Sequence, residues 1–313
     1  MSVFTTLTLD EARTWLRDFA IGEVVELRGI AAGITNTNYF VITQNARYVL
    51  TIFEKNNLEE LPYFVDLMRH LAAHGVPCPA PIADVSGVAL HALKGKPALM
   101  VSCLQGKDVA TPNLAQVVEV ALTLAKLHVA GDSFKQVSHN QRGQDWFVQT
   151  AQKVLPRLNL HDQMLLQNEL SFQQALDTSG LPHGVIHGDL FRDNVLFYND
   201  ILGGFIDFYY ACNDVLAYDV AIAVNEWCLH HNGADLGNID VEKVDAFLSA
   251  YQSVRPLSMA EKNLWNSLLR RATLRFWLSR LHDLYFPIEG EITHAKDPNH
   301  FKSILKARIA LEH

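Results

Sequence analysis

The spacing of apolar positions changes along the chain, from a strand-like period to a helical one near residue 105. Thr8 and Glu11 form a capping-box pattern, and apolar residues follow at helical spacing through Phe19. A second helix is expected over 58–74, ending at Gly75 before a proline-rich segment. Short segments rich in Val, Ile, Tyr and Thr predict five strands, at 24–30, 39–43, 47–53, 88–92 and 98–104.

The rest of the chain has mostly helical periodicity. Only the block 185–208 interrupts it, with short apolar runs typical of strands. The pattern therefore predicts an α+β protein of two parts, a strand-rich lobe over 1–104 and a helical lobe over 105–313, with a hinge near 104–107. The helices of the second lobe are expected at 114–129, 146–158, 163–176, 215–230, 241–252, 259–285 and 298–310.

Composition narrows the class of protein. With 313 residues, 49% apolar and 19% charged, the chain is typical of a globular protein with a sizeable core. A net charge of −8 argues against nucleic-acid binding, and no segment reaches the roughly 20 apolar residues that span a membrane. The four cysteines are far apart, so neither a zinc site nor a disulfide framework is expected. A reducing compartment is the simpler reading, and with no signal-peptide pattern we expect a cytoplasmic protein.

The most specific chemistry lies at 187–208. His187-Gly-Asp189 is followed by Asn194 and, after a second apolar run, by Asp207-Phe208. Phosphoryl transfer to a hydroxyl requires a base beside the acceptor and oxygen ligands for magnesium. Asp189 would serve as the base, and Asn194 with Asp207 as the ligands of Mg²⁺. Taken singly, each of these residues is more typical of a turn between buried strands. Taken together, with apolar strands on both sides, they favour a catalytic site.

Candidate nucleotide contacts in the first lobe are inferred from the position of the residues in the lobe more than from the residue types. The turn between the first two strands could place backbone N–H groups over phosphates, although a polar hairpin turn explains it equally well. A backbone edge at Ser102 and Leu104, where the fifth strand meets the hinge, could pair with adenine; a buried strand end has the same pattern. The residues of the turn are Gly33, Thr35, Asn36 and Asn38.

The third strand lacks a feature common in kinase-like lobes. Such strands usually carry a Lys or Arg that holds the α- and β-phosphates, and here the position is Thr51. Arg47 and Lys55 flank it, and either could substitute or be a solvated charge at a strand end.

A polar and aromatic stretch follows Asp207-Phe208 and suits a pocket for an amino acid or a sugar. Its candidate acceptor contacts are Tyr209, Asn213, Asn225 and Trp227, the last two on a helix expected from about residue 214. The alternative is an ordinary helix with Asp214 as its N-cap.

The motif at 187–208 resembles that of the aminoglycoside-phosphotransferase and choline-kinase group, which shares the protein-kinase-like fold. Four further stretches, 33–40, 48–55, 207–214 and 218–228, are similar to the homoserine kinases of that group, and the likeness spans roughly residues 5–308. The resemblance implies a two-lobed fold with an antiparallel-sheet N-lobe and a mainly helical C-lobe.

The same resemblance implies transfer of a phosphoryl group from ATP, with Mg²⁺, to the side-chain hydroxyl of L-homoserine. Asp189 would be the base and Asn194 and Asp207 the metal ligands. The acceptor's α-carboxylate requires a cation, and Arg192, inside the catalytic loop, is the hypothesis from sequence. Two alternatives stay open: a kinase for choline, an aminoglycoside or methylthioribose, and a nucleotide-binding pseudokinase, to which Thr51 would point.

Overall fold

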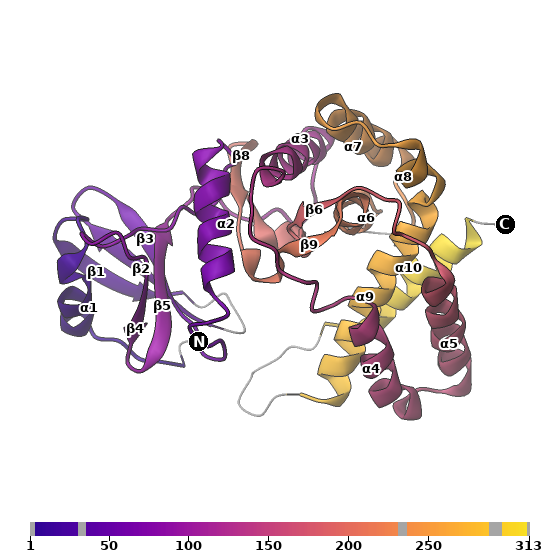
Figure 1. Ribbon diagram of the computed structural model, residues 1–313, viewed down its shortest axis with the longest axis horizontal. Helices are drawn as coiled ribbons and strands as arrows, with labels where there is room; N and C mark the ends of the chain where they lie inside the picture. Colours follow the sequence, from indigo (N-terminus) through magenta and orange to yellow (C-terminus); the bar gives the residue numbers. More distant parts are fainter. Residues whose placement is uncertain (1–3, 31–35, 231–236, 288–295, 312–313) are drawn as a thin grey trace. The chain divides into compact units, whose positions relative to one another are not determined.

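The computed structural model describes residues 4–30, 36–230, 237–287 and 296–311. The chain divides into two compact units. Unit 1 contains residues 1–105 and 203–206, and unit 2 contains residues 106–202 and 207–313. Unit 1 is rich in strands and unit 2 is mainly helical (Figure 1). The predicted α+β class, with an antiparallel sheet in one lobe and helices in the other, is confirmed.

Unit 1 is built on a five-stranded antiparallel sheet with the strand order β1-β2-β3-β5-β4. Lys94 and Gly95 join β4 to β5 with φ angles of 52° and 77°, the left-handed conformation that two-residue hairpin turns require. The strands are β1 (Val24–Gly29), β2 (Thr37–Thr43), β3 (Arg47–Ile52), β4 (Leu90–Leu93) and β5 (Lys96–Ser102).

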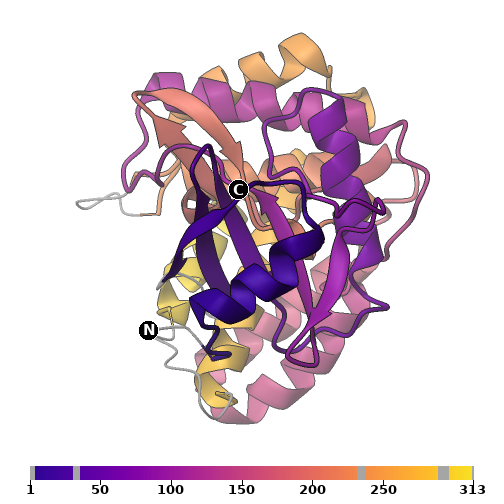
Figure 2. The ribbon, with the colours of Figure 1, turned by 90° about the vertical axis from the view of Figure 1, so that its left-hand side faces the viewer.

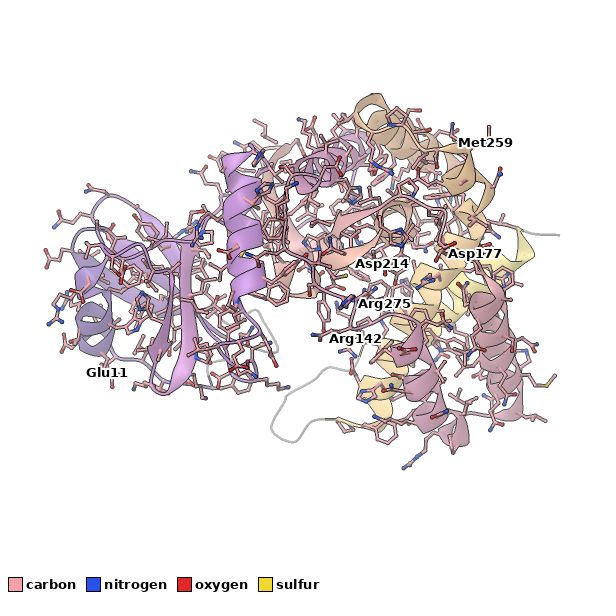
Figure 3. The ribbon with its side chains drawn as sticks, viewed as in Figure 1. Glu11, Arg142, Asp177, Asp214, Met259 and Arg275 are labelled. Carbon is pink, nitrogen blue, oxygen red and sulfur yellow. The ribbon has the colours of Figure 1, made fainter. Side chains whose placement is uncertain are left out.

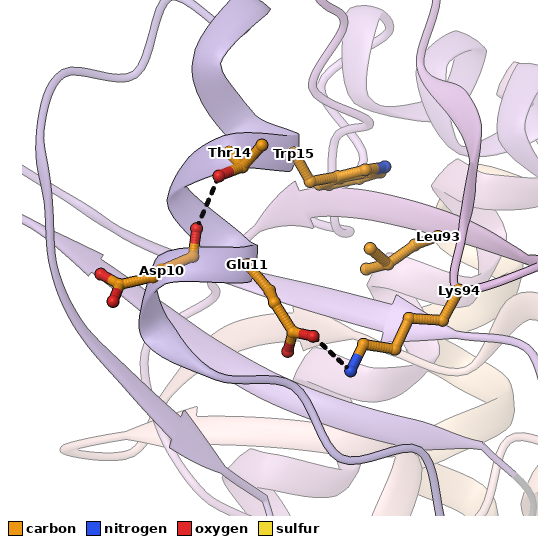
Figure 4. Close-up of a pocket in the computed structure, with 6 residues that line it drawn as sticks. All are labelled: Asp10, Glu11, Thr14, Trp15, Leu93 and Lys94. Carbon is orange, nitrogen blue, oxygen red and sulfur yellow. Dashed lines mark hydrogen bonds and ion pairs between the residues drawn. The ribbon is translucent and has the colours of Figure 1, made fainter.

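One face of this sheet packs against α1 (Leu9–Trp15), which lies across it in Figure 2. The predicted capping box is present, since Thr8 and Glu11 each accept the other's backbone N–H. Glu11 also pairs with Lys94 of the β4–β5 turn at 2.8 Å (Figure 4). Alternate strand residues such as Tyr39, Val41 and Leu50 complete the core beneath the helix.

Several predicted boundaries in unit 1 are wrong by two to four residues: β2 begins at Thr37 instead of 39, and β5 spans Lys96–Ser102 instead of 98–104. Two other shifts have a visible local cause. The helix α2 (Pro62–Ala73) begins four residues later than expected, because the Asn57 side chain accepts the N–H groups of Glu59 and Glu60 and holds them in a turn. Strand β4 lies two residues beyond its predicted start, because Val88 donates its N–H to the Asp84 side chain in a preceding turn.

Unit 2 places its helices around α6 and α9, which contact each other and are largely buried. Among the described residues, α3 alone is long and apolar enough to cross a membrane, and 56% of it is buried, as in a core helix. The helices are α3 (Leu114–Gly131), α4 (Gln144–Val154), α5 (Leu160–Ala175), α6 (Leu216–Trp227), α7 (Val241–Val254), α8 (Met259–Asn263), α9 (Trp265–Tyr285) and α10 (Pro298–Ala310).

Predictions in unit 2 also need correction: α4 and α5 begin two and three residues earlier than expected, and two other segments differ in kind. The helix expected over 259–285 is two helices, because the backbone of Leu264 (φ −100°, ψ 8°) separates α8 from α9. The helix expected from about 214 begins at Leu216. Asp214 belongs instead to β9 (Cys212–Val215), which pairs antiparallel with β6 (His183–Ile186), and so it is not an N-cap.

Candidate active site

The loop that follows β6 carries the first part of the predicted motif. Gly188 has φ 74°, and a Cβ at this position would lie 2.8 Å from the carbonyl oxygen of Tyr210. Only glycine therefore fits between the two backbone segments. The loop ends in a 3-10 turn at Arg192–Asn194, which leads into β7 (Val195–Tyr198).

Asp189 and Asn194 are in direct contact. The Asn194 amide donates to the Asp189 carbonyl at 2.8 Å and to its carboxylate Oδ2 at 3.2 Å. The Asp189 side chain is 19% exposed, so it can meet a ligand while its orientation is fixed by the protein. The structure thus brings together two of the three predicted catalytic residues.

Asp219, on α6, fixes the backbone of the same loop. Its carboxylate is fully buried and accepts the backbone N–H groups of His187 at 2.7 Å and Gly188 at 2.9 Å. His128 Nε2 lies 3.1 Å from it, and His128 Nδ1 lies 2.6 Å from the Tyr251 hydroxyl. Burial alone would raise the pKa of Asp219, but these hydrogen bonds and the nearby His128 and His187 lower it below its ordinary value.

Asp207 follows β8 (Ile201–Phe205) and has a left-handed backbone, with φ and ψ both 63°. This conformation costs a non-glycine residue roughly 1–2 kcal/mol. Asp207 is exposed to solvent and can meet a ligand, although protein atoms are dense around its carboxyl group. Burial and the nearby charge of Asp189 raise its pKa to about 7, against a hydrogen bond from the Tyr209 N–H that lowers it. A carboxyl group that has a second carboxylate nearby suits a cation.

Arg275, on α9, is a site residue that the sequence analysis missed. Its guanidinium donates to the Gly188 carbonyl at 2.6 Å and lies 3.4 Å from Asp189 Oδ1, with the side chain 5% exposed. The sequence did contain one indication of this role. Arg275 precedes the apolar residues Phe276 and Trp277 in a predicted helix, and a charge that is buried among apolar side chains needs a polar partner.

Arg192, predicted to bind a substrate carboxylate, is engaged elsewhere. Its Nε lies 2.7 Å from the carboxylate of Glu226, which is nearly buried, and its NH1 donates to the Ala110 carbonyl. Burial raises the pKa of Glu226, although the Arg192 charge opposes the rise. An arginine held in this way braces the catalytic loop against α6.

Asn225 and Trp227 were expected to contact the acceptor, and their burial contradicts this. Asn225 is 2% exposed; its amide donates to the Leu269 carbonyl, and its oxygen accepts from Arg308. Trp227 is fully buried and donates to the Leu190 carbonyl at 3.0 Å. The polar atoms of both side chains serve packing within unit 2.

Tyr209 and Asn213, unlike Asn225 and Trp227, are not buried. Tyr209 lies in the 3-10 turn Phe208–Tyr210 directly after Asp207, and both it and Asn213 are partly exposed. Asn213, in β9, accepts the Ser138 N–H at 3.0 Å and donates its own N–H to the Ser138 carbonyl at 2.8 Å. It therefore holds the 138–143 loop beside β9.

In unit 1 the predicted phosphate turn is only partly described. Gly33 and Thr35 lie outside the described residues. Asn36 accepts the Glu54 N–H at 3.3 Å, and Asn38 accepts the Thr51 hydroxyl at 2.8 Å. Thr51, at the position that usually carries a basic residue, thus makes a hydrogen bond between two uncharged side chains. Arg47 is four residues away along β3, roughly 13 Å, with its guanidinium over the Phe40 ring.

The end of β5 is hydrogen-bonded to the segment before it. The Ser102 N–H donates to the Ala80 carbonyl, and the Ser102 hydroxyl accepts the Ala80 N–H. The backbone N–H of Ser102 therefore already has a protein partner. Leu104, two residues later, is partly exposed. A pocket in unit 1, between α1 and the β4–β5 turn, contains none of the predicted site residues (Figure 4).

The fold and the contacts of Asp189 define the class: a kinase-like phosphotransferase. Residues 26–257 match the model of the phosphotransferase enzyme family. The chain is 53% identical to a homoserine kinase of Methylobacillus flagellatus and 50% identical to one of Methylobacillus glycogenes, each over 99% of this chain and 96% of the relative. The chain therefore belongs to the phosphotransferase enzyme family and, within it, to the homoserine kinases.

Solved structures support the fold assignment. A spectinomycin phosphotransferase, determined with ADP and spectinomycin, is similar to this chain with a TM-score of 0.72. The two are 12% identical, and the similarity covers 98% of this chain and 99% of the other. At this identity the likeness concerns the fold alone.

Proposed function

We propose that the protein transfers the γ-phosphoryl group of ATP to the side-chain hydroxyl of L-homoserine, forming O-phospho-L-homoserine on the route to threonine. The observation that carries the proposal is the likeness to homoserine kinases, 43–53% identical over 99% of this chain. We place the activity in the cytoplasm, in keeping with the isolated cysteines, of which Cys78, Cys212 and Cys228 are buried.

In the proposed reaction Asp189 accepts the proton of the acceptor hydroxyl. Asn194 orients this base through its two hydrogen bonds, and Arg275 holds the opposite carboxylate oxygen. Little covalent work falls to the protein in phosphoryl transfer, so positioning of the hydroxyl supplies most of the rate. A base in this role contributes typically 10²–10⁴-fold.

Mg²⁺ fits the donors present. Asn194 and Asp207 provide oxygen atoms, which this ion prefers. Burial raises the pKa of Asp207 first and the charge of Asp189 second, and a divalent cation would neutralise the charge of both carboxylates. When bound, the ion would offset the charge of the phosphate oxygens. We assign the nucleotide to backbone groups of the 33–38 turn, to Asn36 and Asn38, and to the segment at Ser102 and Leu104.

An acceptor panel in a coupled ADP-release assay tests the function. The panel contains L-homoserine, choline, methylthioribose and an aminoglycoside, and mass spectrometry identifies the phosphorylated product. We expect turnover of L-homoserine with a kcat/KM at least about 100-fold above the others, a margin worth roughly 2.7 kcal/mol. Preferred turnover of another acceptor would replace the proposed substrate, and nucleotide binding without any turnover would indicate a pseudokinase.

The Asp189→Asn variant tests the base. We expect kcat to fall by roughly 10²–10⁴-fold, with nucleotide affinity nearly unchanged, because the amide keeps the shape but accepts no proton. Turnover equal to that of the wild-type enzyme would exclude this role for Asp189.

A further inference from the structure

Two arginines approach the Tyr210 ring beside the catalytic loop. The guanidinium carbon of Arg275 lies 5.3 Å from the ring centre, and that of Arg142 lies 5.9 Å from it. Arg275 also contacts Asp189, so the ring links Arg142 to the proposed base. Tyr210 is 43% exposed and presents apolar surface at this point. Arg142 and Arg275 lie in the same region of unit 2 (Figure 3).

Arg142 differs from the other arginines near the loop. Arg275 and Arg192 are each within ion-pair distance of a carboxylate, whereas no described carboxylate lies within 4.0 Å of Arg142. Its guanidinium is 4.6 Å from the Trp146 ring centre, and its backbone N–H donates to Asn140 Oδ1 at 2.8 Å. A partly buried guanidinium that is held in place without an anion is suited to bind one.

The acidic side chain of Asp214 is hydrogen-bonded to the segment that carries Arg142. The Asn140 amide donates to Asp214 Oδ2 at 2.6 Å, and Asp214 Oδ1 accepts the Val215 N–H at 2.7 Å. Asp214 is only partly buried, and a carboxylate has about four acceptor positions, so it can accept further hydrogen bonds. Asn140 thus connects the backbone of Arg142 to the carboxylate of Asp214, so that a cationic and an anionic residue belong to one hydrogen-bonded segment.

Buried polar atoms in this region have no protein partner. The Tyr218 residue is 1% exposed, and among the described residues nothing pairs with its hydroxyl. The charges of Arg275, Arg271 and Asp214 act on its pKa, which burial raises, so this hydroxyl belongs to the same region. Both polar atoms of the Gln144 amide, two residues after Arg142, are likewise buried and unpaired. Unpaired buried polar groups are rare, and a bound ligand or ordered water would provide the missing partners here.

We propose that Arg142 binds the α-carboxylate of the acceptor and Asp214 its α-ammonium group, with the methylene chain against the Tyr210 ring. The inference rests on the proposed function and assigns the amino-acid end of the substrate to residues that the sequence analysis did not select for it. It replaces Arg192 as the cation that faces the carboxylate.

Matched acceptors provide the test. L-Homoserine carries both charged groups, L-homoserine amide lacks the carboxylate, and 4-hydroxybutanoate lacks the ammonium. We expect Arg142→Ala to lower kcat/KM for L-homoserine and 4-hydroxybutanoate about 100-fold, mainly through KM, and to leave the amide unaffected. Asp214→Asn should lower kcat/KM for L-homoserine and its amide, and leave 4-hydroxybutanoate unaffected.

Two further variants serve as controls. Arg157, exposed and over the Phe286 ring of the same unit, should be replaceable by Ala without effect on any acceptor. Arg271, near Tyr218, is the competing cation. If Arg271→Ala shows the carboxylate-specific loss, or if Arg142→Ala affects L-homoserine and its amide equally or not at all, the inference is overturned. A wild-type protein without activity on L-homoserine would overturn the proposed function, and this inference with it.

Discussion

The hydrogen bonds from the catalytic loop to the Asp219 carboxylate lead to a prediction about the Asp219→Asn variant. In Asp219→Asn only one oxygen remains to accept the N–H groups of His187 and Gly188, which now lie 2.7 and 2.9 Å from two carboxylate oxygens. The new NH₂ group must face either the Gly188 N–H or, at the other oxygen position, both the His187 N–H and the ring of His128. At least one buried N–H loses its partner, and the remaining bonds lose their charge.

The magnitude follows from these contacts. An unsatisfied buried donor costs about 1–3 kcal/mol, and a charge-assisted hydrogen bond is worth about 1.5–3 kcal/mol. We therefore expect the free energy of unfolding to fall by about 3 kcal/mol. For a unit of this size that lowers Tm by roughly 6–12 °C. Displacement of the loop by about 1 Å should lower kcat about 100-fold.

Thermal unfolding and steady-state kinetics at a temperature well below Tm measure the two effects separately. Tyr251→Phe is the matched control, because the hydroxyl belongs to the same network through His128 but does not touch the loop. It should lower stability by about 1 kcal/mol and leave kcat unchanged. Wild-type stability and kcat in Asp219→Asn, or equal losses of kcat in both variants, would refute the positioning role.

Three further predictions concern other contacts. In Glu169→Ala the Arg270 side chain, 7% exposed, loses the buried carboxylate that lies 2.6 Å from its guanidinium. Chemical denaturation should show that the free energy of unfolding falls by about 3–5 kcal/mol, and a fall under about 1 kcal/mol would contradict this. Gly188→Ala should lower kcat at least about 100-fold, since its Cβ would lie 2.8 Å from the Tyr210 carbonyl; an active variant would show that the loop tolerates the shift. Arg192→Ala leaves Glu226 without its cation, and because the pKa of this acid is already raised in the folded protein, the stability loss should be greater at pH 8 than at pH 5. A loss independent of pH, or a raised KM for L-homoserine at full stability, would argue against the bracing role.

The sequence was sufficient to predict those elements that are determined by residues close together in the chain. Residues 187–208 carry their own turn chemistry and apolar strands, so Asp189, Asn194 and Asp207 could be selected from spacing alone. Most helices were found for the same reason. Boundaries were wrong where a side chain diverted the backbone into a turn, as Asn57 does before α2 and Asp84 does before β4.

The acceptor residues were harder because their environment is built from distant segments. Asn225 and Trp227 suggested a pocket by composition, yet α9 and the catalytic loop use their polar atoms for packing. Conversely, Arg275 reaches Asp189 across 86 positions of sequence, and Asn140 reaches Asp214 across 74. No periodicity signals such a meeting, since it depends on tertiary packing.

The return of the chain to unit 1 at Gly203–Ile206 affects how the protein can be divided. The Phe205 N–H donates to the Pro77 carbonyl at 2.9 Å, and a Cβ on Gly204 would lie 2.5 Å from the same oxygen. A fragment that ends at Gln105 would lack this segment and leave that carbonyl without its donor. A split version of the enzyme, cut for reassembly from two polypeptides, would therefore need the 203–206 peptide supplied to the first fragment, and its absence should appear as poor recovery of the isolated sheet.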